Sequence, residues 1–218
     1  MMEIIKLSGI YDKRTLKMAQ EIGVKFFEFD FRPRSFNFVQ QYVLEEVLES
    51  VTSSDDIVSL HFQNEANFVV DNILNSFKDI AIKPQLVFSD TQSPVYYDSF
   101  KRPYMWHHSP DADLKAVLKS KYNMGIILSY GYLEDLHRLG TLQSFITNLY
   151  VQLKEVGGLN KTIGLKIDWD SNLAPSIFEL VDFDFLDLPI NDKVEVCYRN
   201  VDSTKLRRNI EILKNLAC

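Results

Sequence analysis

The chain has 218 residues, of which 46% are hydrophobic and 25% charged, and its formal net charge is −6. This length and composition are typical of one globular domain, residues 1–218, that buries a full core without cross-links. The negative charge argues against nucleic acid as the partner, and no apolar run approaches the roughly 20 residues that a membrane helix needs.

Strand-like and helix-like segments alternate from the beginning of the chain. Glu3–Ser8 is apolar without a helical period, and Asp12 can cap a helix that continues to Glu21. Val24–Arg32 then alternates between an aromatic and a charged face, namely Phe27, Phe29 and Phe31 against Glu28, Asp30 and Arg32. This first strand–helix–strand unit predicts the pattern of the rest.

The same alternation continues to the end of the chain. Further strands are predicted at Asp56–Gln63, Gln85–Asp90, Tyr104–His108, Asn123–Ser129, Thr162–Asp170 and Phe183–Leu188. Helices are predicted at Gln40–Ser53, Asn67–Asp79, Asp111–Lys121, Tyr132–Val156 with a break near Gly140, Leu173–Leu180 and Asp202–Leu216, whereas Thr91–Arg102 is at best a short helix. Eight strand–helix pairs in this length predict an α/β fold, a single closed (β/α)₈ barrel.

The charged face of the second strand should point into such a barrel, with its aromatic face toward the helices. The same parity in the seventh strand predicts that Glu28, Asp30, Lys166 and Asp168 lie inside and pair with one another, because lone interior charges are costly. Barrel enzymes place their chemistry at the carboxyl ends of the strands. Asp30, His61 and Asp168 are therefore candidate acid–base groups, while only one of His107 and His108 can point inward.

No metal or cofactor is predicted. Asp30, His61, Asp168 and Asp187 are suitable ligands for a divalent ion, but their spacing does not demand one. The two cysteines, Cys197 and Cys218, stand in no metal-binding spacing and predict no disulfide framework. Because the first residues, MMEIIKLSG, also lack the pattern of a signal peptide, we expect a cytoplasmic protein.

Several stretches resemble phosphoribosylanthranilate isomerases. They are KLSGI at Lys6–Ile10, FEFDFRPRS at 27–35, HFQNE at 61–65 and VDSTKLRRNI at 201–210. The resemblance implies a TIM barrel and descent from enzymes of tryptophan biosynthesis that convert a phosphoribosylamine to its ketose by an Amadori rearrangement.

The chemical positions depart from that family's pattern. Ser8 stands where the family has a cysteine base, Ser129 where it has an aspartate acid, and Asn37 where it has an arginine. The glycine-rich phosphate cradle of the family is reduced to Gly140-Thr141 after the sixth strand. Its later parts are replaced by Asp170-Ser171-Asn172 after the seventh strand and by Ile190-Asn191 after the eighth. A serine hydroxyl does not ionise near neutral pH without a partnered base, and an aspartate repels a phosphate dianion. We therefore expect the ancestral reaction to be lost.

The sequence accordingly predicts a diverged barrel that binds or converts an unknown small metabolite at its carboxyl-end mouth, as a monomer or homodimer. The candidate catalytic residues are Ser8, Asp30, His61, Ser129 and Asp168, and the candidate ligand-binding residues are Arg32, Arg34, Asn37, Ser89, Asp170 and Asn191. Two alternatives stay open: a working isomerase that uses Ser8 and Ser129, and a non-catalytic barrel that binds a protein. A catalytic mouth predicts a concave pocket with perturbed carboxylates, whereas a non-catalytic one predicts closure by Phe36, Phe38 and Tyr130.

Overall fold

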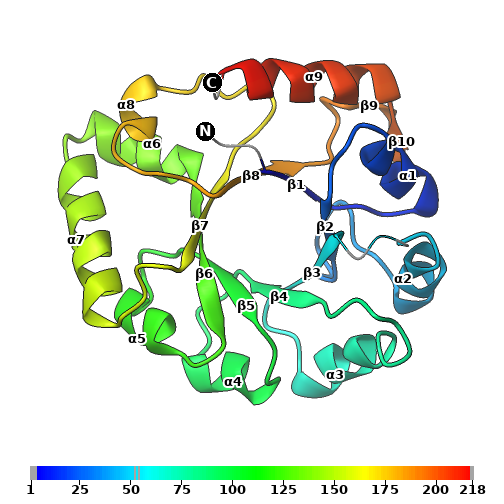
Figure 1. Ribbon diagram of the computed structural model, residues 1–218, viewed down its shortest axis with the longest axis horizontal. Helices are drawn as coiled ribbons and strands as arrows, with labels where there is room; N and C mark the ends of the chain where they lie inside the picture. Colours follow the sequence, from blue (N-terminus) through cyan, green and yellow to red (C-terminus); the bar gives the residue numbers. More distant parts are fainter. Residues whose placement is uncertain (1–3, 52, 54, 217–218) are drawn as a thin grey trace.

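Eight parallel strands close into one barrel in the computed structural model, which describes residues 4–51, 53 and 55–216. The elements in chain order are β1 (Ile4–Ser8), α1 (Lys13–Glu21), β2 (Phe26–Asp30), α2 (Gln41–Leu48), β3 (Ile57–Phe62), α3 (Asn67–Asn75), β4 (Gln85–Phe88), α4 (Pro94–Ser99), β5 (Tyr104–His107), α5 (Leu114–Lys119), β6 (Asn123–Ser129), α6 (Tyr130–Arg138), α7 (Leu142–Glu155), β7 (Thr162–Lys166), α8 (Pro175–Phe178), β8 (Phe185–Pro189), β9 (Glu195–Cys197), β10 (Asn200–Val201) and α9 (Ser203–Leu216). The strands follow one another around the ring and the helices surround them (Figure 1), which confirms the predicted (β/α)₈ barrel. Glu3 and Cys218 lie outside the described residues.

The register of the strands sets which side chains share a level inside the barrel. β1 closes the ring against β8, with Lys6 opposite Asp187, and Asp187 lies opposite Lys166 of β7. On the other side of the barrel, Asp30 of β2 lies opposite His61 of β3. Since paired residues of neighbouring parallel strands point to the same face, charged side chains from five strands converge inside the ring.

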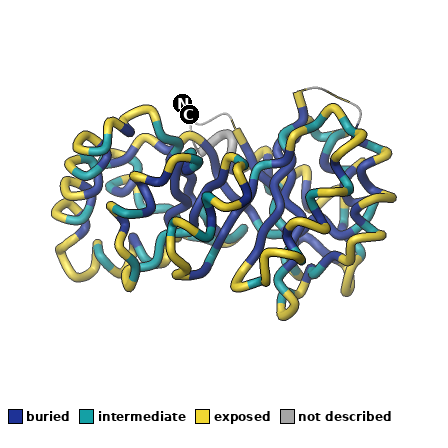
Figure 2. The backbone as a smooth tube through the Cα atoms, turned by 90° about the horizontal axis from the view of Figure 1, so that it is seen from below, coloured by how far each residue is buried: buried dark blue, intermediate teal, exposed yellow. Residues whose placement is uncertain are grey.

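Two apolar cores hold the strands in place. The large one lies between the sheet and the helices and includes Phe27, Phe29 and Phe31, so the predicted direction of this aromatic face is confirmed. The small one fills the amino end of the barrel interior with Phe26, Val87, Met105, Ile127 and Phe185. Figure 2 shows the buried segments gathered in the strands and on the inner faces of the helices. The interior above the small core is left to polar side chains.

Glycines in β6 and β7 allow the strands and the small core to pack closely. A Cβ at Gly125 would overlap the backbone of Thr162 in the neighbouring strand, and a Cβ at Gly164 would overlap the ring of Phe185. Both positions therefore require glycine for space.

Most helix boundaries follow the sequence signals. Asp12 accepts a hydrogen bond from the Thr15 N–H, which confirms it as the N-cap of α1. The predicted break near Gly140 is confirmed, because α6 ends at Arg138 and α7 begins at Leu142. No helix in the described part of the chain is long and apolar enough to cross a membrane.

Two features differ from the prediction. An antiparallel hairpin, β9–β10, lies between β8 and α9 and turns at Arg199, whose φ is 55°. β7 ends at Lys166 rather than at Asp170, because the chain turns at Asp168, whose carbonyl accepts the N–H of Ser171. This earlier end changes the position of Asp168.

Candidate functional site at the barrel mouth

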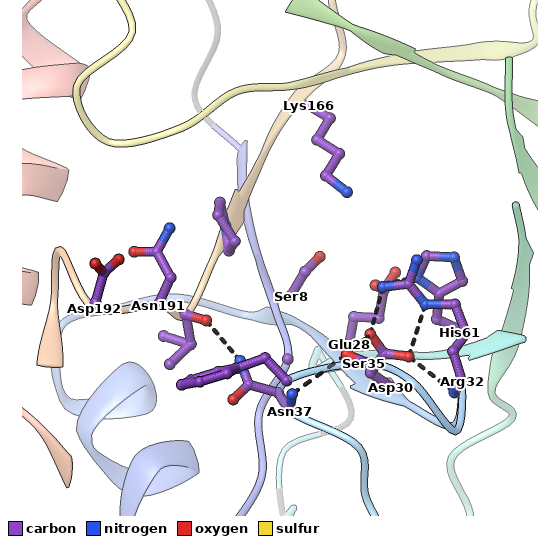
Figure 3. Close-up of a pocket in the computed structure, with 14 residues that line it drawn as sticks. Ser8, Glu28, Asp30, Arg32, Ser35, Asn37, His61, Lys166, Asn191 and Asp192 are labelled. Carbon is purple, nitrogen blue, oxygen red and sulfur yellow. Dashed lines mark hydrogen bonds and ion pairs between the residues drawn. The ribbon is translucent and has the colours of Figure 1, made fainter. Parts of the chain in front are cut away.

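A cavity of about 370 Å³ lies at the carboxyl end of the barrel (Figure 3). It is lined by residues at strand ends and in loops. The polar ones are Ser8, Glu28, Asp30, Arg32, Ser35, Asn37, His61, Lys166, Asn191 and Asp192, and the others are Gly9, Phe36, Pro189 and Ile190. The closure that a non-catalytic barrel predicts is not formed: Phe36 is 55% exposed at the cavity wall, Phe38 does not line the cavity, and Tyr130 is buried with its hydroxyl donating to the Asn172 carbonyl. The mouth therefore has the concave form expected of a ligand site.

A buried ionic cluster forms the floor of this cavity. Lys6 is fully buried and forms ion pairs with Glu28 and with Asp187, the latter at 3.3 Å. Burial alone would lower the pKa of Lys6, but Asp187 and Glu28 outweigh it and raise this pKa above its ordinary value. Burial alone would raise the pKa of Glu28, but Lys6 and His61 hold it well below its ordinary value. The floor is therefore ionised.

Two residues of the predicted catalytic set, Ser8 and His61, form hydrogen bonds to carboxylates of this cluster. The Ser8 hydroxyl donates to Asp187, and His61 Nδ1 lies 2.9 Å from a carboxylate oxygen of Glu28. Because an ionised carboxylate only accepts hydrogen bonds, Nδ1 of His61 carries the hydrogen. His61 is 1% exposed, and its Nε2 has no hydrogen-bond partner among the described residues.

The imidazole of His61 is also held from one side by His107. The two rings stack with their centroids 4.9 Å apart and an angle of 12° between their planes. Burial, together with the charge of Lys166, holds the pKa of His107 well below its ordinary value, so this ring stays neutral. Of the two neighbouring histidines, His107 is the one that points inward.

At the cavity wall, both carboxylate oxygens of Asp30 already accept hydrogen bonds from neighbouring side chains. Arg32 donates to both of its oxygens, from Nε at 2.9 Å and from Nη2 at 2.5 Å, and Ser35 Oγ donates at 2.6 Å. Burial alone would raise the pKa of Asp30, but the hydrogen bonds and the charge of Arg32, together with the hydrogen bond from Ser35, lower it. Asp30 is therefore held as an ionised acceptor that shapes the loop after β2.

Asn37 joins two loops at the cavity rim. Its side-chain amide donates to the Ile190 carbonyl at 2.6 Å, which links the loop after β2 to the loop after β8. Gly9 makes room for this contact: its φ is 85°, and a Cβ there would lie 2.6 Å from Asn37 Nδ2.

Asp168 does not lie inside the barrel with Lys166 or Glu28, so this part of the predicted pairing is wrong. Its side chain is 41% exposed and forms an ion pair with Lys193 at 2.7 Å. Lys193 also pairs with Asp170, and Asn191 Nδ2 donates to Asp168 at 3.0 Å. These contacts occupy the place where the family resemblance implies a phosphate cradle.

The remaining predicted residues lie apart from the main cavity. Ser129 is exposed at the end of β6, and the half-buried Ser89 follows β4 with its hydroxyl unpartnered within the described residues; neither lines the cavity. Arg34 is exposed and lines a second cavity of about 670 Å³ between the loops after β2 and β3. In the described ranges no three His, Cys, Asp or Glu side chains are arranged to hold a metal ion.

Several residues at the mouth were not in the predicted site, among them Glu28, Ser35, Lys166 and Asp192 in the cavity lining and Lys193 beside it. Lys166 satisfies the inward parity, but its expected pairing with Glu28 and Asp168 concealed its position in the cavity. Lys193 lies in a loop 25 residues from Asp168, and no periodicity signals its contact.

Comparison with known proteins identifies the architecture. No family model matches the chain, and the curated proteins contain no match. Among solved structures, phosphoribosylanthranilate isomerase from Thermus thermophilus aligns with a TM-score of 0.68 and 14% identity over 98% of this chain and 99% of that one. A phosphoribosylanthranilate isomerase in complex with reduced 1-(o-carboxyphenylamino)-1-deoxyribulose 5-phosphate gives the same score and identity over 99% and 100%.

The likeness is not confined to isomerases. An HpcH/HpaI aldolase from Desulfitobacterium hafniense aligns with a TM-score of 0.61 and 10% identity over 99% of this chain and 93% of that one. Identities this low carry information about the fold alone. The chain therefore has a (β/α)₈ barrel fold like that of the phosphoribosylanthranilate isomerases.

Proposed function

We propose that this chain is a diverged, single-domain phosphoribosylanthranilate isomerase-like barrel that binds a small metabolite at its mouth and no longer catalyses the ancestral isomerisation. The observation that carries the proposal is the cavity at the carboxyl end of the strands, where the buried Nε2 atom of His61 has no hydrogen-bond partner among the described residues. A cavity of about 370 Å³ lies at the lower end of the range found for small-molecule sites.

Three features support the loss of the ancestral reaction. The Ser8 hydroxyl is bound to Asp187, and Ser129 does not line the cavity, so neither takes the place of the family's acid–base pair. Where the resemblance implies phosphate binding, Lys193 is already paired with Asp168 and Asp170. A phosphate dianion would have to compete with both carboxylates for this lysine.

The site retains one group suited to proton transfer. Glu28 and Asp30 are held ionised by their partners, and a carboxylate with a lowered pKa is a poor proton donor near neutral pH. His61, oriented by Glu28 through Nδ1, has Nε2 left to accept a proton. If the bound metabolite is converted, His61 is the base.

A blocking substitution tests the binding site. Asp192 is exposed at the cavity rim, so Asp192→Trp places a large ring over the opening. Metabolites that raise the melting temperature of the wild-type protein in a library screen should lose this effect in Asp192→Trp. Asp182→Trp, an exposed position at the amino end of the barrel, is the matched control and should retain it. Equal shifts in both variants, or no stabilising metabolite at all, would refute the site.

Loss of the ancestral activity is tested by complementation. A tryptophan auxotroph that lacks phosphoribosylanthranilate isomerase should not grow without tryptophan when it expresses this chain, and the purified protein should give no signal in a fluorescence assay of the reaction. Growth that disappears with Ser8→Ala would instead make Ser8 catalytic and overturn the proposal.

A further inference from the structure

Lys166 is a cation in the mouth, and its ammonium has no counterion among the described residues. It is the last residue of β7, it lines the cavity, and its amine extends toward the group formed by Glu28, Arg32 and His61 (Figure 3). This amine forms no hydrogen bond or ion pair with the described residues, whereas the side chains of Lys6 and Arg32 are both paired. An unpaired ammonium in a cavity favours an anionic group on the ligand.

His61 offers the complementary atom. Its Nδ1 hydrogen is committed to Glu28, and in this tautomer Nε2 carries a lone pair that can accept a hydrogen bond. This nitrogen is buried at the cavity and lacks a partner among the described residues, although buried polar atoms are normally satisfied. Stacking against His107 fixes the plane of the ring. The ligand should therefore bring a hydrogen-bond donor to this point.

The surrounding charges favour a singly charged ligand. Glu28, Asp30 and Asp192 all line the cavity, and Asp187 lies beneath it in the floor. Each additional negative charge on the ligand is repelled by these carboxylates, so a carboxylate is accommodated more easily than a phosphate dianion. Phe36, Pro189 and Ile190 supply an apolar wall for the body of the ligand.

We infer that the ligand is a small hydroxy acid with an apolar body, whose carboxylate binds the Lys166 ammonium and whose hydroxyl donates to His61 Nε2. This inference rests on the proposed small-molecule function of the mouth and adds the chemical class of the ligand. It assigns binding to Lys166, which the family resemblance does not mark as a site residue.

A matched set of probes separates the two contacts. Mandelate carries both groups, phenylacetate lacks the hydroxyl, and mandelamide lacks the charge; 3-hydroxy-3-phenylpropanoate, with 3-phenylpropanoate and its own amide, repeats the comparison at a longer spacing. Calorimetric titration of the wild-type protein should give tighter binding for at least one hydroxy acid than for either of its partners, by about tenfold, the usual effect of one hydrogen bond to a charged or buried group.

The variants assign each contact to its residue. In Lys166→Met the preference for the acid over the amide should disappear while the preference for the hydroxyl remains, and Lys166→Arg should retain both. His61→Phe should lose only the hydroxyl preference. Lys115→Met, which removes an exposed lysine paired with Glu155 outside the cavity, should leave every affinity unchanged.

Because His61→Phe removes a partner of Glu28 and can impair folding, nitrogen-15 spectra of the four histidines in the wild-type protein give a second measurement. The Nε2 resonance of His61 should move with the hydroxy acid and not with its deoxy partner.

The outcomes distinguish the ligand class from the proposed function. Cavity-dependent binding that ignores charge and hydroxyl alike, or tighter Lys166-dependent binding of glycerol 3-phosphate, would overturn the hydroxy acid and leave the small-molecule function intact. If neither these probes nor a metabolite library bind in a manner sensitive to Asp192→Trp, both proposals fail together.

Discussion

Lys6 illustrates how one residue in this barrel is tolerated only through its partners. Its ammonium is fully buried between Glu28 and Asp187, and the pairing offsets a desolvation cost of several kcal/mol per ion. The sequence pattern predicted this pairing of Glu28 but assigned it to Lys166. Alternation tells which face a side chain takes, and not which of two lysines on that face reaches a given carboxylate.

Removing Lys6 should be costly. Lys6→Met leaves two buried carboxylates without their shared cation, so we expect the free energy of unfolding to fall by about 3–5 kcal/mol. Urea denaturation measures this change. Lys115→Met is the control, because an exposed pair of this kind usually contributes less than about 1 kcal/mol. A loss for Lys6→Met as small as that of the control would show that the cluster is not buried.

His108 should make stability depend on pH. Burial lowers its pKa to about 4, whereas an unfolded histidine titrates near about 6.5. Between these values the unfolded state binds the proton first, so the free energy of unfolding should fall as the pH falls, by up to about 1.4 kcal/mol per pH unit. The lowered pKa of His107 acts in the same direction.

The test compares unfolding free energies at a series of pH values from 7 to 4. His108→Phe should flatten the profile, since Trp106, Tyr132 and Phe145 already form an aromatic surround for the ring. His137→Gln, at an exposed position, should keep the wild-type slope. An unchanged slope in His108→Phe would show that this histidine titrates alike in both states.

At the scale of elements, the sequence predicts most of the barrel because strands buried against helices impose a visible alternation. The prediction fails where that alternation continues beyond the strand. Ile167 and Trp169 still pack outward after β7 has ended, but Asp168 between them turns to Lys193 instead of into the barrel. The β9–β10 hairpin is missed because its strands have only three and two residues, too few for an apolar period to mark them.

Close packing between β6 and β7 gives a prediction at this scale. Gly125→Ala sets a methyl group against the Thr162 backbone, which cannot move without breaking the strand pairing, and should cost about 3 kcal/mol or more. Gly131→Ala in α6 meets only Ser129 Oγ at 3.8 Å, so it should stabilise the protein by up to about 1 kcal/mol. Thermal and urea unfolding of the two variants measures the contrast. Equal stability would mean that the two strands are less tightly packed than described.

For the molecule as a whole, the site is predictable only in part. The parity of the strands predicts that Ser8, Asp30 and His61 approach the mouth, and they line its cavity. Contacts made by loops are not predictable in this way, because Asn37 with Ile190 and Lys193 with Asp168 depend on how distant turns meet. The role of each of these residues in binding or catalysis stays a prediction.

The loop contacts also predict how hard phosphoribosylanthranilate isomerase activity is to obtain in this barrel. Ser8→Cys combined with Ser129→Asp introduces the base and acid that the resemblance implies, yet leaves Lys193 paired with Asp168 and Asp170 where the resemblance implies a phosphate. We expect the double variant not to support growth of the tryptophan auxotroph. Growth from these two changes alone would show that a working phosphate site persists in the loops after β7 and β8.

The ionic floor of Lys6, Glu28 and Asp187 has a consequence for the temperature response of the barrel. The hydration of charged groups becomes less favourable on warming, so the free energy lost by withdrawing these three ions from water decreases as temperature rises. The apolar cores behave differently, because their stabilisation weakens on cooling. Cooling therefore raises the desolvation cost of the ionic floor and weakens the apolar cores at the same time. Relative to a barrel with an all-apolar interior, this barrel should lose more stability on cooling.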